Sequence, residues 1–267
     1  MCTAGAEQEG LVRGCGCRGD SGTAHLSCLV RQAKILQQDD VGVQGTQKWW
    51  RKCKVCGQWF EGAVARALTW ACWKHALVAS YPDPDEQNIY QIMGMHVLGC
   101  TLRNEGRHSE SIAVTRAKFE FLQGSSHADP GSSFEIEAIE HIALDLYDLE
   151  RYEEALPLIR ECYAAQLARD AESDVSRRTA FEYCRTLVRL KRVDQARVLY
   201  RKHLPVGSQT DNIDVERAQI YYLGSLLSEG VISQSELREA KNLLERKCKR
   251  ARQAHGSDGP ETREAKR

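Results

Sequence analysis

A small residue recurs along this sequence about every 40 residues, and this period limits the chain to a stacked array of repeats. In the aligned segments 109–112, 153–156, 194–197 and 238–241 it is Ser111, Ala155, Ala196 and Ala240, at steps of 44, 41 and 44 residues. An earlier small residue accompanies each one, at Gly99, Ala143, Cys184 and Gly224. Small side chains on both members of a helix pair allow close approach, so each unit is predicted to be two packed helices stacked on the next.

Residues 85–255 carry the helical period almost throughout. Apolar residues stand three or four positions apart, as at Ile136, Ile139, Ile142, Ala143 and Leu146, which is the spacing of one helix face. Breaks rich in Pro and Gly separate the units. We predict helix-turn-helix spans at 86–122, 134–171, 174–203 and 212–254, with one bridging helix at 62–80. Strand-like alternation is absent, so the predicted fold class is mostly α.

One unit carries a family resemblance. The segment 149–158, Leu-Glu-Arg-Tyr-Glu-Glu-Ala-Leu-Pro-Leu, resembles the tetratricopeptide repeat (TPR), in the longer form found in kinesin light chains. The resemblance covers 85–255 in about four repeats and implies an α-helical solenoid whose concave groove holds a peptide or helix of a protein partner. Another array of helical hairpins is the structural alternative.

Cysteines crowd the N-terminal part of the chain. Six of the 11 lie in the first 56 residues, in the pattern Cys15-x-Cys17-x7-His25-x2-Cys28-x24-Cys53-x2-Cys56 with Cys2 upstream. Close pairs of thiolate and imidazole ligands suit tetrahedral Zn²⁺, and a small Gly-rich segment without its own core needs such a staple to fold. The remaining cysteines, Cys100 among them, are interpreted as core residues.

The ligand spacing resembles the RING-variant (RING-CH) zinc finger, over residues 2–60. That resemblance implies a cross-brace, in which Cys15, Cys17, Cys53 and Cys56 hold one Zn²⁺. Cys2, His25 and Cys28 are then the candidate ligands of a second site, which lacks one cysteine and is incomplete. We expect that the chain is truncated at its N-terminus; the alternative is that water or another group completes the site.

The same resemblance implies a function. RING-variant fingers bind a ubiquitin-conjugating enzyme and act as ubiquitin ligases by proximity, without covalent chemistry of their own. On this hypothesis the protein is a zinc-binding interaction factor whose repeats hold the substrate. The missing first ligand pair and the Lys54-Val55 pair before the last ligand depart from active fingers. A non-catalytic TPR scaffold with a structural zinc finger as its cap is therefore the alternative.

The remaining features mainly exclude function classes. With 37 basic and 37 acidic residues, the balanced charge argues against nucleic-acid binding, and no apolar run is long enough for a membrane span. There is no motif for a catalytic residue or an organic cofactor. The lack of a secretory signal predicts a cytoplasmic protein, and the basic run 246–252 makes a nuclear location the alternative.

The sequence therefore predicts four parts. Residues 1–62 form a small zinc-stapled RING-variant-like module, and 63–84 form the bridging helix and linker. Residues 85–255 form the TPR-like repeats, and 256–267 form a disordered basic tail.

Overall fold

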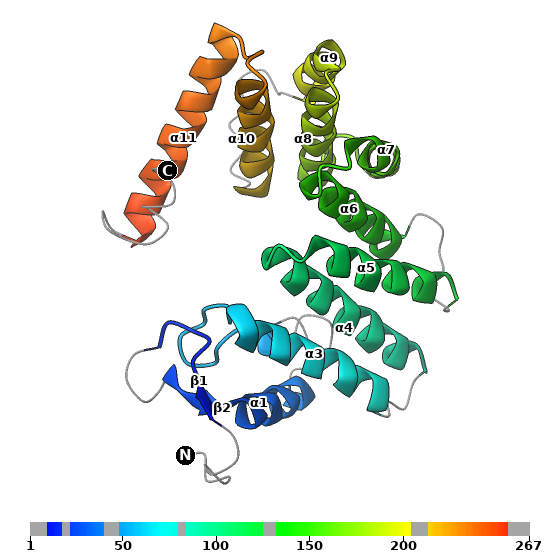
Figure 1. Ribbon diagram of the computed structural model, residues 1–267, viewed down its shortest axis with the longest axis vertical. Helices are drawn as coiled ribbons and strands as arrows, with labels where there is room; N and C mark the ends of the chain where they lie inside the picture. The colour runs from blue at the N-terminus through cyan, green and yellow to red at the C-terminus, as the bar shows by residue number, and fades with distance from the viewer. Residues whose placement is uncertain are drawn as a thin grey trace. The chain divides into compact units, whose positions relative to one another are not determined.

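Helices make up most of the computed structural model, which describes residues 10–17, 22–39, 48–79, 84–124, 132–203 and 213–255 (Figure 1). The chain divides into two compact units, residues 1–149 and 150–267. The predicted ligand Cys2 and the predicted disordered tail 256–267 lie outside the described residues.

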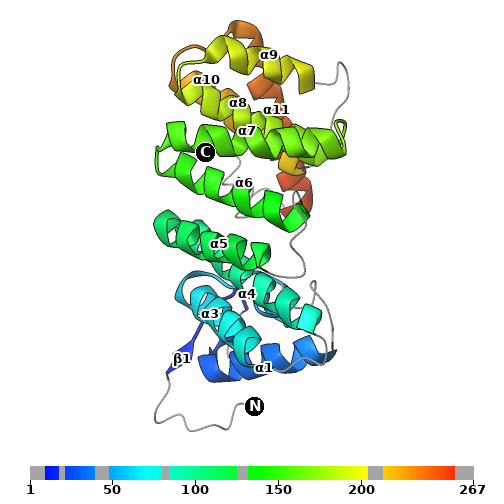
Figure 2. The same cartoon turned by 90° about the vertical axis from the view of Figure 1, so that its right-hand side faces the viewer.

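The first unit begins with a two-stranded antiparallel sheet. Strand β1 (Leu11–Val12) pairs with β2 (Ala24–His25) in the register Leu11↔His25. The helices that follow are α1 (Leu26–Asp39), α3 (Gly62–Val78), α4 (Pro84–Asn104), α5 (His108–Gln123) and α6 (Ser133–Asp148). Each helix packs on the next one in this order, so α3 separates the N-terminal segment from the first repeat (Figure 2).

Two packing features tie the N-terminal segment to the helices. Trp50 is fully buried with Ala33 of α1 and Cys72 of α3, and its indole Nε1 donates to the Gln37 side-chain oxygen at 2.6 Å. Farther along, a Cβ at Gly94 of α4 would lie 2.9 Å from the Trp73 Cα of α3. A larger residue at this point would force α3 and α4 apart.

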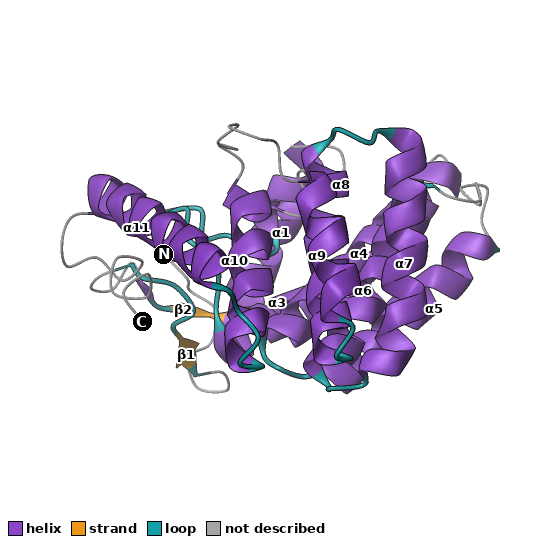
Figure 3. Cartoon of the chain, turned by 90° about the horizontal axis from the view of Figure 1, so that it is seen from above, coloured by secondary structure: helices purple, strands orange, loops and turns teal. Residues whose placement is uncertain are grey.

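The described part of the second unit consists of helices joined by loops, with no strand (Figure 3). It contains α7 (Tyr152–Arg169), α8 (Asp174–Arg189), α9 (Val193–His203), α10 (Ile213–Ser228) and α11 (Gln234–His255). Helix α8 lies at the centre, packed on α7, α9 and α10, while α11 packs on α10. The core gathers Phe181, Tyr200, Tyr222 and Leu223.

The four turns that join the paired helices share one backbone conformation. A residue with positive φ follows the first helix of each pair: Gly106 (φ 74°), Glu150 (61°), Lys191 (61°) and Gly230 (68°). In three of the turns this residue donates its N–H to a carbonyl three residues back, and the next N–H reaches a carbonyl five back, which is the Schellman ending. Glycine adopts this conformation without steric cost, whereas Glu150 and Lys191 do not.

The recurring small residues bring helices together in two of the repeats. Ser111 Oγ donates to the Gly99 carbonyl at 3.1 Å, and Cys184 Sγ donates to the Ala196 carbonyl at 3.3 Å. In the fourth repeat a Cβ added at Gly224 would meet nothing within 4 Å. Close approach at the repeated small positions therefore holds for the first and third repeats and is looser in the fourth.

The predicted mostly α fold is confirmed. The sequence did not predict helix α1 or the two short strands. Within the part of the chain that the structure describes, no helix has both the length and the apolar character that a membrane crossing requires.

Candidate metal centre

Four of the predicted ligands come together in space. The Sγ atoms of Cys15, Cys17, Cys53 and Cys56 all lie within 4.8 Å of one another. The first two follow strand β1, and the other two belong to a turn between Trp50 and Phe60. These are the two cysteine pairs that the cross-brace resemblance grouped on one ion.

A tight turn presents the second pair. The Gly57 N–H donates to the Cys53 carbonyl at 2.9 Å, and the Cys53 N–H donates to the Gln58 carbonyl at 2.8 Å. Gly57 has φ 69°, a conformation that glycine adopts most readily. An antiparallel bridge between Lys52 and Trp59 closes the hairpin on either side of the cysteines, so local hydrogen bonds fix both thiols on one side of the turn.

Contacts to the hairpin also fix the first pair. The Gly16 N–H donates to the Gln58 side-chain oxygen at 3.1 Å, and a Cβ at Gly16 would approach that oxygen to 2.2 Å. The Glu61 N–H donates to the Gly14 carbonyl at 2.9 Å. A Cβ at Gly14 would press to 2.6 Å from Val64 in the first turn of α3. The cluster is therefore packed against the start of that helix.

The sulfur spacing fits a tetrahedral metal ion. For Zn–S bonds of about 2.3 Å, tetrahedral geometry places neighbouring sulfurs about 3.8 Å apart. Cys17 Sγ and Cys53 Sγ are 3.7 Å apart, and both residues are buried while Cys56 is exposed. The four cysteines could therefore bind a metal without rearrangement of this pair.

The thiols differ in acidity because of their hydrogen bonds. The Gln58 backbone N–H stabilises the Cys56 thiolate and is the main cause that lowers the pKa of Cys56 to about 7. Hydrogen bonding to Cys56, followed by burial, raises the pKa of Cys17 to about 12. For Cys15, burial is the largest cause, and it raises the pKa of that thiol. Cys56 thus loses its proton more readily than Cys15 or Cys17 when a cation arrives.

The other predicted ligands lie outside this cluster. His25 is buried, and its Nδ1 lies 4.0 Å from Cys28 Sγ. Cys28 takes part in a disulfide bond in this structure, so only its reduced form could serve as a thiolate ligand. These two residues remain neighbours, as the resemblance implied, while their ligation of a metal stays a prediction.

A pocket of about 340 Å³ lies beside the hairpin. Its aromatic walls come from Trp50, Trp59 and Phe60, and its other side is formed by α3 and the end of α4, including Glu105. Trp59 is 47% exposed, with the Arg51 guanidinium 4.4 Å from its ring centre. The pocket thus combines an aromatic face with charges of both signs.

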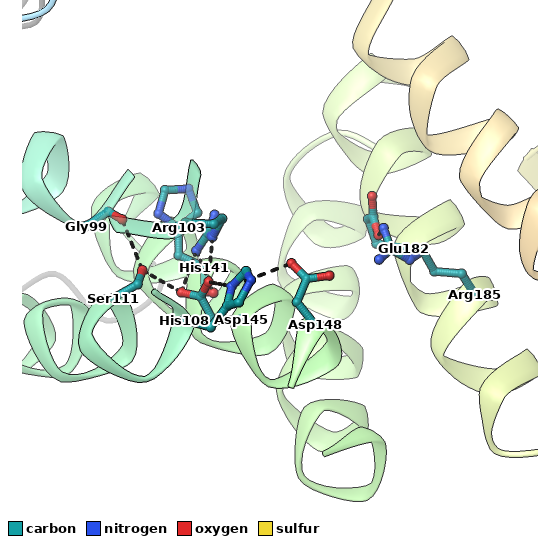
Figure 4. Close-up of polar contacts among 9 residues, drawn as sticks. All are labelled: Gly99, Arg103, His108, Ser111, His141, Asp145, Asp148, Glu182 and Arg185. Atoms are coloured by element: carbon teal, nitrogen blue, oxygen red, sulfur yellow. Dashed lines mark hydrogen bonds and ion pairs between the residues drawn. The ribbon is translucent and has the colours of Figure 1, made fainter. Parts of the chain in front are cut away.

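The first unit contains two polar groupings that the sequence did not predict. One is a network around the fully buried Asp145, which binds Arg103, His108 and Ser111 from α4 and α5 (Figure 4). The other is a gathering of His96, Cys100 and His141, whose ligand atoms lie within 4.8 Å of one another. An available signal was the equal 41-residue step from His96 to Glu137 and from Cys100 to His141.

Comparison with known proteins identifies the fold. No protein-family model matches the sequence, and no curated protein matches it. The crystal structure of BtubC (BKLC) from P. vanneervenii is similar with a TM-score of 0.53 at 16% identity, over 86% of this chain and 89% of that one. A variant of a candidate kinesin light chain from Podosopora anserina, with nearly identical TPR-like repeats, has a TM-score of 0.50 at 14% identity, covering 86% and 95%.

These similarities, with the paired helices and their recurring turns, show a helical-repeat protein of the TPR-like class.

Proposed function

We propose that this protein is a zinc-dependent protein-interaction scaffold, in which a four-cysteine Zn²⁺ centre caps the N-terminal end of TPR-like repeats. The observation that carries the proposal is the convergence of Cys15, Cys17, Cys53 and Cys56 within 4.8 Å. A four-thiolate set favours Zn²⁺ among the common divalent ions, and closed sites of this kind are structural.

The position of the cluster supports a capping role. The chain before Cys15 packs on the first turn of α3, and α3 packs on α4, the first helix of the repeats. A terminal repeat exposes an apolar face that needs a cover. Trp50, Leu68 and Cys72 are buried in this covering layer, so a metal that orders the hairpin also holds the cover in place.

Zinc removal tests the cap directly. We expect purified full-length protein to contain Zn²⁺ by elemental analysis and a strong chelator to expose Trp50, with a red shift of tryptophan emission. Cys53→Ser should reproduce the shift without chelator, whereas Cys248→Ser, in α11 of the second unit, should not. A chain that binds no zinc, or that keeps its emission spectrum when zinc is removed, would reject the capping centre.

The pocket beside the hairpin is the proposed contact for a protein partner. Aromatic faces with a nearby guanidinium favour an apolar or carboxylate-bearing side chain of that partner. Proteins retained by the full-length chain should be lost on Trp59→Ala and kept on Trp70→Ala, which changes a partly exposed tryptophan of α3 outside this pocket. Equal loss from both variants would argue against the pocket.

Ubiquitin-ligase activity is a second candidate function. The pairing of Cys15 and Cys17 with Cys53 and Cys56 across the sequence is the grouping of a RING-type cross-brace, and this observation favours it. The test incubates the zinc-loaded full-length chain with activating enzyme, a panel of conjugating enzymes and ubiquitin. Chains that form with the wild type and not with Cys53→Ser would support ligase activity. Without chains, the scaffold is the remaining function.

A further inference from the structure

We propose that His96, Cys100 and His141 form a second transition-metal site, which joins the first helix of one repeat to the first helix of the next. This inference does not depend on the four-cysteine centre, since it uses other residues and other helices. Its chemistry is one thiolate and two imidazoles, a ligand set that suits Zn²⁺.

Helix geometry brings these residues together. His96 and Cys100 are four positions apart on α4, and Glu137 and His141 are four positions apart on α6. Residues at this spacing share one face of a helix. His96 and Cys100 therefore lie on one face of α4, and Glu137 and His141 lie on the face of α6 that is turned toward them. The imidazole rings of His96 and His141 lie nearly parallel, with centroids 5.4 Å apart and an interplanar angle of 24°.

The distances fit a metal ion that is shared by the three side chains. The three ligand atoms lie within 4.8 Å of one another, and Cys100 Sγ is 3.6 Å from His96 Nε2. With Zn–N near 2.05 Å and Zn–S near 2.3 Å, a tetrahedral ion would place these two atoms about 3.6 Å apart. Three protein ligands leave the fourth position to water or another small ligand.

A carboxylate lies within ion-pair distance of the buried imidazole. While Nε2 of His96 faces Cys100, its Nδ1 lies 3.3 Å from Glu137 Oε2. Metal-binding histidines usually place their second nitrogen against a carboxylate, which fixes the ring and its tautomer. Lys118 Nζ also lies 3.3 Å from Glu137 Oε2, so a cation from α5 holds the carboxylate in place. Glu137 is thus a positioning residue.

The charges around the cluster can accommodate a divalent cation. Lys118 is paired with Glu137, and the nearby Arg103 is paired with Asp145 through Nε at 2.9 Å. Arg103 also donates through Nη2 to the His141 carbonyl at 2.6 Å (Figure 4), which fixes the backbone that carries this ligand. The Cys100 thiolate and the Glu137 carboxylate supply the negative charge near the ion.

The test isolates this site in a full-length chain carrying Cys15→Ser and Cys53→Ser. We expect this chain to bind one Zn²⁺ by elemental analysis and one Co²⁺ with a thiolate charge-transfer band. Adding His141→Gln should abolish both signals, and adding His75→Gln, a histidine of α3 outside the cluster, should preserve them. Failure of the four-cysteine centre alone would leave these results unchanged, so the two proposals fail separately.

A second measurement guards against misfolding. In the presence of chelator, His141→Gln in the otherwise wild-type chain should melt at the wild-type temperature. Zinc should raise the midpoint less in this variant than in the wild type. The site is overturned if the Cys15→Ser, Cys53→Ser chain binds no zinc, or if it keeps its zinc after His141→Gln. Alkylation of Cys100 at equal rates with and without zinc would also overturn it and would instead indicate a metal-free thiolate–imidazole pair.

Discussion

Removing the Asp145 carboxylate should destabilise the first unit more than removing any surface ion pair of that unit would. Asp145 is fully buried. Its oxygens accept from Arg103 at 2.9 and 3.1 Å, from His108 at 2.9 Å and from Ser111 at 2.6 Å. These partners come from α4 and α5, while Asp145 belongs to α6, so one carboxylate links three consecutive helices.

The size of the effect follows from what Asp145→Ala leaves behind. Removing one partner of a buried ion pair costs about 3–5 kcal/mol because the other charge stays uncompensated. Arg103 keeps its bond to the His141 carbonyl. The single proton of the Ser111 hydroxyl, which lies within reach of both Asp145 and the Gly99 carbonyl, can turn to that carbonyl. The lower end, about 3 kcal/mol, is therefore expected. For a unit of this size it corresponds to roughly 6–12 °C in midpoint temperature.

Tryptophan fluorescence measures this unit alone, because all 5 tryptophans lie between residues 49 and 73. The matched control is Glu110→Ala, which removes the exposed Arg107–Glu110 pair and should cost no more than about 0.5 kcal/mol. In a double-mutant cycle, Asp145→Ala should cost much less when Arg103 is already alanine. A loss below about 1 kcal/mol for Asp145→Ala, equal to the control, would refute this reasoning.

Three further predictions concern backbone strain, acid and metal. Lys191 and Gly106 both have positive φ, which glycine adopts without steric cost. Lys191→Gly should therefore stabilise the second unit by about 0.5–1 kcal/mol in a thermal melt followed by circular dichroism. Gly106→Ala should destabilise the first unit by about 1 kcal/mol in a melt followed by tryptophan fluorescence. Burial would raise the pKa of Glu236, but hydrogen bonds, first from Arg197, outweigh burial and lower it. Its stabilising effect is thus complete above the ordinary glutamate pKa and is lost as the pH falls through the lower folded value; Glu236→Gln should flatten this acid dependence in hydrogen exchange of α11. Gly57→Ala strains the turn that carries Cys53 and Cys56, because Gly57 has positive φ. Zinc affinity in a chelator competition should therefore fall, and unchanged affinity would contradict the assigned turn geometry.

The repeats were predictable because their signal is local and recurs. Predicted spans such as 174–203 correspond closely to α8 and α9, since small residues, apolar periods and Pro-rich breaks all lie within one repeat. The grouping of four cysteines followed from a resemblance in spacing. The first signal lies within single repeats, and the second is a spacing pattern that spans residues 15–56.

Helix α1 shows why other features were missed. Its inward face carries Gln37 where the apolar period needs an apolar residue, because the Gln37 side chain accepts the indole N–H of Trp50. That partner comes from another segment and cannot be read from the helix itself. The cluster of His96, Cys100 and His141 was hidden in the same way, because its members appear ordinary until α6 is placed against α4.

A metal held by the four cysteines would also act on residues that it does not touch. Linking Cys17 to Cys53 closes a loop of 36 residues, and such a closure lowers the entropy of the unfolded chain by an amount equivalent to about 4 kcal/mol at 25 °C. Helix α1 lies inside this loop. Loss of the ion would therefore return that entropy to the unfolded chain and destabilise folded α1, although the contacts of α1 with Trp50 and Cys72 include no ligand.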